Sequence, residues 1–119
     1  AAVLIPRAAF DDALGNLVRN ALRSSAEHGL SPIPLGLRVR ALVDPVTGLE
    51  RVAFHVLDAS PARLSTEMIR SRHPEGGLGI ASDIVARYEG TIEVQREEAP
   101  WTKAVVMIFD RTHAEEESA

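Results

Sequence analysis

The sequence contains no cysteine and few aromatic residues, and both shortages exclude classes of protein. Without cysteine there is neither a disulfide framework nor a thiolate metal site. The four histidines are spread along the chain and do not cluster at the spacing of metal ligands. Aromatic residues make up only 4% of the chain, so it offers no platform on which the bases of a nucleic acid would stack.

Long apolar runs and an excess of positive charge are also missing. No run approaches the roughly 20 apolar residues that a membrane-spanning helix needs, and the first residues lack the basic region of a signal peptide. A net charge of −4 argues against a general nucleic-acid binder. We therefore expect a cytoplasmic domain that contacts neither membrane nor nucleic acid. Ala1 in place of methionine indicates a fragment, so the full-length protein can still carry a membrane anchor elsewhere.

The composition indicates one soluble globular domain. The chain has 119 residues, of which 45% are hydrophobic and 25% charged, which is enough apolar material for a core. We predict a folded domain over residues 1–110. Residues 111–119 contain three consecutive glutamates and are expected to form an acidic, disordered tail.

Apolar periodicity predicts three helices and four strands. The expected helices span residues 7–27, 63–70 and 79–88, and the expected strands span 35–43, 51–57, 91–96 and 102–110, with a possible short edge strand at 2–5. In 35–43 apolar residues alternate with Arg38 and Arg40, which predicts a strand with one buried face. Two pairs of hairpin-type strands with helices to cover one face indicate an α+β fold, built as a two-layer sandwich.

Two asparagines and an arginine stand on one side of the first predicted helix. Asn16 and Asn20 lie one turn apart beside the apolar stripe, and Arg23 follows three residues later. Asparagine is a poor helix former because its side chain competes for backbone hydrogen bonds. Two asparagines one turn apart in a helix therefore indicate a specific role. Amide oxygens and a guanidinium on one face suit a hydrated cation and a phosphate. The alternative is that both asparagines only cap or bridge to a neighbouring loop.

Two further features indicate a ligand site. Asp58 continues the inward-facing alternation of the second predicted strand, so its carboxylate leaves the strand on the core side, where an unpaired charge is costly. Gly76, Gly77 and Gly79 precede the third predicted helix, and a loop with so many glycines can approach a ligand closely.

Three segments then follow one another in order: NLVRNALR at 16–23, a strand that ends in Asp58 before a proline turn, and GGLGIASDIVARYEGTIEV at 76–94. Together they resemble the N, G1 and G2 boxes of the GHKL ATPase/kinase superfamily. The nearest branch is the ATP-binding catalytic domain of sensor histidine kinases, and the resemblance covers about residues 10–110. It implies the Bergerat-type fold, in which a mixed sheet is covered on one face by three helices and the nucleotide lies between them.

The resemblance also implies a nucleotide site for ATP and Mg²⁺. Its six residues are Asn16, Asn20, Arg23, Asp58, Gly77 and Gly79. In this scheme Asn20 coordinates Mg²⁺ and Arg23 contacts a phosphate, so these two residues are the catalytic ones. Asp58 accepts a hydrogen bond from the amino group of adenine. The backbone amides of the two glycines lie near the phosphates, at a helix N-terminus whose dipole favours an anion.

The activity that the resemblance implies is that of a protein-histidine kinase. The γ-phosphoryl of ATP would go to a histidine on a separate dimerisation domain of the same protein, with a response regulator downstream. No histidine of this chain is followed by the acidic residue that marks such an acceptor. Asn16 stands where relatives that hydrolyse ATP carry a glutamate base, which favours phosphoryl transfer, a reaction that needs mainly positioning and charge neutralisation. Dimerisation belongs to the other domain, so this chain is expected to be monomeric.

The G1 segment departs from the family pattern and supports a different function. The pattern D-x-G-x-G here reads DASPA, with Ser60 and Ala62 in place of the glycines. A β-carbon at either position can press on the adenine pocket or forbid a positive φ. The lid between G1 and G2, at 65–75, is also short. The alternative expectation is a degenerate GHKL domain that acts as a regulatory or protein-interaction module with weak or no nucleotide binding.

Overall fold

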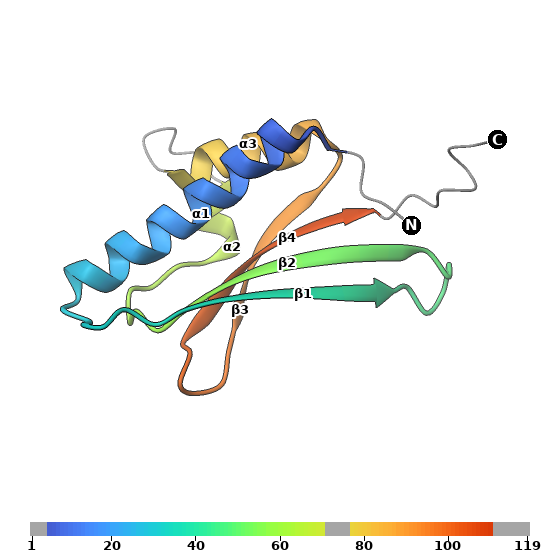
Figure 1. The fold of residues 1–119 in the computed structure, drawn as a ribbon. Coiled ribbons are helices and arrows are strands. Elements are labelled where there is room, and N and C mark those ends of the chain that lie inside the picture. The colour runs from blue at the N-terminus through green and yellow to red at the C-terminus, as the bar shows by residue number, and fades with distance from the viewer. Residues whose placement is uncertain (1–4, 71–76, 111–119) are drawn as a thin grey trace.

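The computed structural model of the chain describes residues 5–70 and 77–110 (Figure 1). These residues form three helices and four strands. They are α1 (Arg7–Glu27), β1 (Leu35–Val43), β2 (Glu50–Asp58), α2 (Thr66–Arg70), α3 (Gly77–Arg87), β3 (Thr91–Arg96) and β4 (Lys103–Asp110). The expected α+β class is confirmed, and the helices lie together on one side of the sheet. None of the helices in these residues is long and apolar enough to cross a membrane.

The sheet has the strand order β1-β2-β4-β3, and every pairing between described strands is antiparallel. The mixed sheet that the family resemblance implies is therefore not found in this part of the chain. β1 and β2 form one hairpin and β3 and β4 another, and β4 joins the two by pairing antiparallel with β2. The edge strand expected at 2–5 falls almost wholly outside the described residues, as do positions 71–76 of the lid and glycine loop and the acidic tail at 111–119.

Helix α1 has the predicted bounds because its signals are local. Ala13, Leu17 and Ala21 recur on one face and are buried. The helix ends where Gly29 takes a φ of +75°, a conformation that glycine adopts without strain. The backbone N–H of Leu30 then donates to the carbonyl of Ser25 over 3.0 Å, which satisfies one of the last free carbonyls of the helix.

The turn between β1 and β2 is organised by Asp44. Its carboxylate accepts hydrogen bonds from the backbone N–H groups of Val46 (2.8 Å) and Thr47 (3.1 Å). These two donors hold the pKa of Asp44 below its usual value, because they stabilise the charged form. Gly48 completes the turn with a φ of +72°. The hairpin that the sequence predicted therefore follows from ordinary Asx-turn chemistry.

The main core lies between the helices and the sheet. Phe54 on β2 is partly buried and packs against it, with its ring 4.9 Å from that of Phe10 and 6.1 Å from that of Phe109, both in edge-on geometry. Buried residues from α1, α3 and the three strands other than β1 surround these rings. They include Leu17, Val56, Val85, Ile92, Val105 and Met107.

A smaller cluster lies on the opposite face of the sheet, where Trp101 packs partly against it. Its buried members are Ala53, Leu57, Ala104, Val106 and Ile108. Trp101 approaches the backbone at Gly36, where a Cβ atom would come within 2.9 Å of the indole Cζ2. The connector between β3 and β4 is thus folded back over the outer face of the sheet.

The burial pattern of β1 contradicts the prediction of one buried face. Leu37, Val39 and Val43 face the same side as the inward row of β2, yet each is more than 60% exposed. Neither α1 nor another described helix extends over this edge strand, which packs mainly against β2. Alternation predicted the strand correctly, but burial depends on what covers it.

Candidate nucleotide site around Asp58

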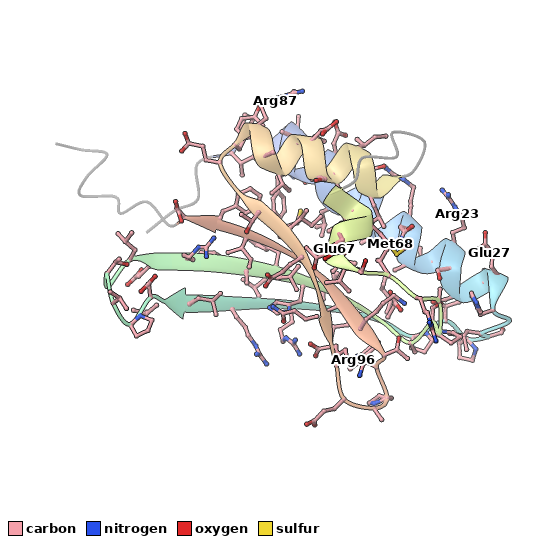
Figure 2. The ribbon with its side chains drawn as sticks, turned by 180° about the vertical axis from the view of Figure 1, so that it is seen from behind. Arg23, Glu27, Glu67, Met68, Arg87 and Arg96 are labelled. Atoms are coloured by element: carbon pink, nitrogen blue, oxygen red, sulfur yellow. The ribbon has the colours of Figure 1, made fainter. Side chains whose placement is uncertain are left out.

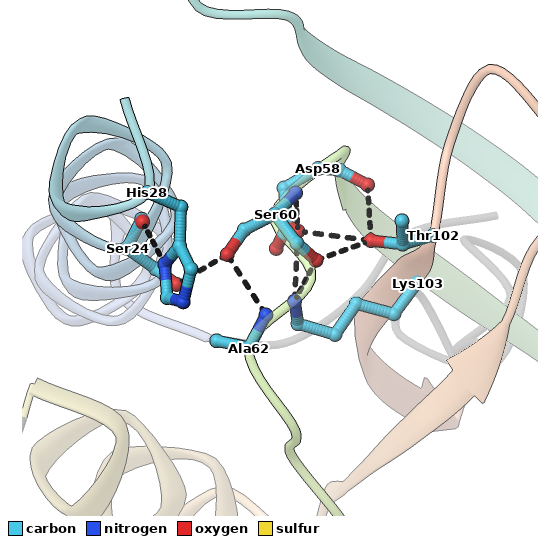
Figure 3. Close-up of polar contacts among 7 residues, drawn as sticks. All are labelled: Ser24, His28, Asp58, Ser60, Ala62, Thr102 and Lys103. Carbon is cyan, nitrogen blue, oxygen red and sulfur yellow. Dashed lines mark hydrogen bonds and ion pairs between the residues drawn. The ribbon is translucent and has the colours of Figure 1, made fainter. Parts of the chain in front are cut away.

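Asp58 ends β2 as a buried carboxylate with a buried cationic partner, Lys103. The carboxylate residue is 2% exposed and Lys103 is 7% exposed. Lys103 Nζ lies 2.9 Å from Asp58 Oδ1, and the same oxygen accepts a hydrogen bond from the backbone N–H of Ser60 over 3.0 Å (Figure 3). The inward phase of Asp58 agrees with the sequence analysis, whereas Lys103 was not anticipated. It pairs directly with Asp58 in the β2–β4 register, which no local sequence pattern reveals.

Thr102, the residue before Lys103, fixes the turn that follows Asp58. Its backbone N–H donates to the carbonyl oxygen of Asp58 (2.9 Å), and its hydroxyl donates to the carbonyl oxygen of Ser60 (2.7 Å). Lys103 Nζ donates to that same Ser60 oxygen over 3.0 Å. Thr102 and Lys103 thus hold the turn through several hydrogen bonds from both backbone and side chains.

Ser60, which replaces the first glycine of the G1 pattern, connects this turn to α1. It is fully buried, and its hydroxyl lies 2.7 Å from the hydroxyl of Ser24 (Figure 3). The backbone N–H of Ala62 donates to the Ser60 hydroxyl over 3.2 Å. Neither Ser60 nor Ala62 has a positive φ, so the backbone does not require glycine at these positions. The serine side chain is used to hold α1 against the G1 turn.

A groove of about 980 Å³ opens between this turn, α2 and the end of β3. Lys103 and Thr102 are part of its lining, and Arg63 and Arg96 add positive charge to its wall, against the single carboxylate of Glu67. The balance of charge suits an anionic ligand. Its lining is Ser60–Met68, Val94–Arg96, Thr102 and Lys103. Helix α2 begins at Thr66 and not at 63, because the Ser65 hydroxyl accepts the N–H of Met68 as an N-cap.

The candidate residues of α1 are not all directed toward this groove. Asn16 donates from Nδ2 to the carbonyl of Asp12 in the same helix over 2.7 Å, a bond within α1 that is neither a ligand contact nor the expected cap or bridge to a neighbouring loop. Asn20 is half-buried, and its amide makes no hydrogen bond to a described residue. Arg23 is exposed and points away from the sheet (Figure 2). No described residue of α1 lines the groove, although Ser24 reaches its G1 turn.

Gly77 and Gly79 lie in the first turn of α3, which begins two residues earlier than predicted. The first backbone N–H groups of a helix have no partner within the helix, so they remain available to an anion. The segment before Gly77 lies outside the described residues. Neither glycine lines the groove beside Asp58.

A magnesium ion fits this donor set only as a phosphate-bound ion. Within residues 5–70 and 77–110 no group of three or more acidic or histidine side chains is arranged to hold a metal. Mg²⁺ usually keeps several waters and binds one or two protein oxygens together with substrate phosphates. The amide of Asn20, which makes no hydrogen bond to a described residue, would provide one oxygen of that kind.

Comparison with known proteins adds no family assignment. No protein-family model matches the chain, and no curated protein matches it.

Proposed function

We propose that this chain is the ATP-binding catalytic domain of a sensor histidine kinase with a GHKL-type fold. It would deliver the γ-phosphoryl of ATP to a histidine on a dimerisation domain of the same protein, and a response regulator would act downstream. Such a domain works in the cytoplasm, where ATP is available. The observation that carries this proposal is the buried, rigidly held carboxylate of Asp58 beside a groove of positive charge.

The Asp58 carboxylate retains acceptor capacity for a base. All its hydrogen bonds from described residues go to Oδ1, from Ser60 N–H, Lys103 and, at 3.5 Å, the Thr102 hydroxyl. An ionised carboxylate has about four acceptor positions on its two oxygens. Oδ2 is therefore available to an exocyclic amino group such as that of adenine. Lys103 compensates the negative charge of this buried carboxylate.

The phosphate end of the ligand would be held by α1 and α3. Asn20 would bind Mg²⁺, which neutralises charge on the phosphates when it is bound. Arg23, which is free in solvent, is long enough to turn toward a phosphate, and the first-turn amides of α3 at Gly77 and Gly79 would donate to its oxygens. These groups position and neutralise the γ-phosphoryl, which is most of what phosphoryl transfer requires of a protein.

A second candidate function rests on two contacts that restrict the pocket around Asp58. Lys103 occupies one carboxylate oxygen of Asp58, and the Ser24–Ser60 hydrogen bond ties α1 to the G1 turn. With these contacts in place, the domain would be a degenerate GHKL module that binds nucleotide weakly or not at all. Its role would then be regulation or protein interaction.

Calorimetric titration with Mg-ATP separates the two functions. For the kinase domain we expect saturable heat with a Kd in the micromolar range, and weakening of at least tenfold in both Asn20→Ala and Asp58→Asn. Asp11→Asn, an exposed carboxylate near the start of α1, is the matched control and should bind like the wild type. Circular dichroism establishes that each variant is folded.

Removal of Mg²⁺ with EDTA adds a test of Asn20. ATP affinity should fall in the wild type and change little in Asn20→Ala, because the variant has already lost the protein ligand of the ion. At a thousandfold excess of ligand over Kd, a working site would gain about 4 kcal/mol of stability. If the wild type shows no heat of binding and no thermal stabilisation, the kinase function is rejected and the interaction module remains.

A further inference from the structure

β1 is one of the two edge strands of the described sheet; β3 is the other. β1 is nine residues long, and β2 is its only strand neighbour in the described part of the chain. An edge strand presents unpaired backbone N–H and C=O groups, which can pair with another extended chain. No proline interrupts β1, so its outer edge is continuous.

One side of β1 is an exposed apolar row. Leu37 is 61% exposed, and Val39 and Val43 are each 63% exposed. These residues face the same side as Phe54 and Val56 of β2, with which Val39 and Leu37 are paired. On β2 this row is covered by the main core, whereas on β1 it is open to solvent. The apolar surface of the sheet thus continues one strand beyond the area that the described helices cover.

The other side of β1 is basic. Arg38 donates to Glu97 over 2.9 Å and lies 3.2 Å from Nδ1 of His55. Arg40 is exposed and makes no ion pair with any residue in 5–70 or 77–110. Both arginines border a hollow of about 540 Å³ next to Trp101, whose wall also carries Arg96, Glu97 and Glu98. Arg38 is paired with Glu97, so Arg40 is the exposed positive charge that stands beside the apolar row at this edge.

We propose that the outer edge of β1 binds an extended segment of a partner protein in which apolar residues alternate with acidic ones. Successive side chains of a strand point to opposite faces, so such a segment would place its apolar row beside Leu37 and Val39 and its acidic row beside Arg40. Backbone hydrogen bonds to the edge would supply affinity, and the two rows would supply specificity. This docking strand is independent of whether the groove binds nucleotide.

A second copy of the chain fits this edge less well than an acidic segment does. In an antiparallel pairing of two β1 strands centred on Val39, Arg38 of one copy would face Arg40 of the other. Like charges directly opposite each other destabilise a strand pair. Charge complementarity therefore favours an acidic partner over self-pairing.

The test is a titration of the ¹⁵N-labelled chain with an octapeptide of alternating valine and glutamate, acetylated and amidated at its ends. We expect amide shifts concentrated in residues 35–43 and slower hydrogen exchange of the outer-edge amides of β1. An octapeptide of alternating valine and lysine should bind at least tenfold more weakly. Arg40→Glu should weaken binding of the acidic peptide about tenfold, by loss of attraction and gain of repulsion, and Val39→Lys should also weaken it.

Arg87→Glu is the matched control, since Arg87 is an exposed arginine on α3, well away from β1 (Figure 2). It changes the net charge as Arg40→Glu does and should leave the affinity unchanged. The proposal is overturned by shifts that map to the groove at α2, by equal affinity for the lysine peptide, or by no saturable binding. Concentration-dependent shifts of β1 without peptide would instead identify a second copy as the occupant and also overturn it.

Discussion

Asp58 and Lys103 are the residues on which the candidate site most depends. Each is a charge that would be very costly to bury alone, and together they satisfy one another at 2.9 Å while the turn at Ser60 supplies further partners. A buried ion pair adds little over a well-packed apolar pair, but removal of one member leaves the other uncompensated. The pair therefore adds little net stability, but neither residue can be replaced alone without a large cost.

Substitution of Lys103 by methionine should therefore be strongly destabilising. Lys103→Met leaves the Asp58 carboxylate buried without its cation, and we expect a loss of about 3–5 kcal/mol in the free energy of unfolding. The double variant Asp58→Asn/Lys103→Met should recover a large part of this loss. Urea denaturation measures both, with Arg96→Met as the control for an exposed neighbouring cation. A loss below about 1 kcal/mol in the single variant would contradict the buried pair.

His55 on the outer face gives the protein a predictable dependence on pH. It is 4% exposed, and its pKa is lowered from 6.5, first by burial and then by the charges of Arg38 and Arg40. Glu97 and Glu93 act in the opposite direction and offset only part of this effect. The unfolded chain therefore takes up a proton near pH 6.5 that the folded chain takes up only at lower pH. Stability is constant above 6.5 and decreases as the pH falls from 6.5 toward the lowered pKa of the folded state.

Urea denaturation about one pH unit above and one pH unit below 6.5 tests this prediction. The wild type should be less stable at the lower pH, and His55→Gln should lose clearly less, because glutamine does not titrate. The comparison between the two proteins removes the contribution of the carboxylates, which they share. Equal loss of stability in both proteins would contradict the lowered pKa of His55 in the folded state.

At the scale of the element, features set by local sequence were predicted correctly, and features set by contacts between distant segments were not. The bounds of α1, β1 and β3 agree with the sequence analysis, because periodicity and flanking turn residues act within each segment. The exposure of the apolar row of β1 was not predictable in this way. An alternating strand reads the same whether or not a helix covers it, and α1 and α3 lie over the strands further in.

The candidate site likewise has features that local sequence predicts and features that depend on distant segments. The inward phase of Asp58 follows from alternation, and the helical spacing of Asn16 and Asn20 follows from α1. The contacts of Asp58 come from Thr102 and Lys103, more than 40 positions away in sequence, and they depend on the register between β2 and β4. A one-residue shift of that register would turn Lys103 to the other face of the sheet. Sequence alone does not set such a register, so the ion pair was missed.

The connector before β4 makes a test of packing at the element scale. Gly36→Ala would place a Cβ atom 2.9 Å from the Trp101 ring and 3.3 Å from Leu57 Cβ, so the indole must move. We expect a loss of about 1–3 kcal/mol in unfolding free energy and a red shift of the fluorescence of Trp101, the single tryptophan. Gly15→Ala is the control, because there the Cβ meets only the flexible end of Arg19, at 3.2 Å. It should be neutral or stabilising, since alanine favours a helix.

At the scale of the whole molecule, the distribution of charge matters more than its sum. The chain carries a net charge of −4, yet the free edge of its sheet presents Arg38 and Arg40 next to exposed apolar residues. Basic residues on an edge strand hinder pairing between identical copies and leave the edge open to a segment of opposite charge. The same arrangement therefore serves both against self-association and toward an acidic partner.

We expect the chain to sediment as a monomer of 12.9 kDa, and the edge arginines to be part of the reason. Arg40→Val removes the like charge that opposes Arg38 in a pair of β1 strands and extends the apolar surface, so it should shift sedimentation equilibrium toward a dimer. Arg87→Val removes the same charge from α3 and should leave the chain monomeric, which separates the edge effect from the change in net charge. A wild-type dimer that dissociates on Val39→Lys would reverse the argument, because the edge would then pair copies of this chain despite its arginines.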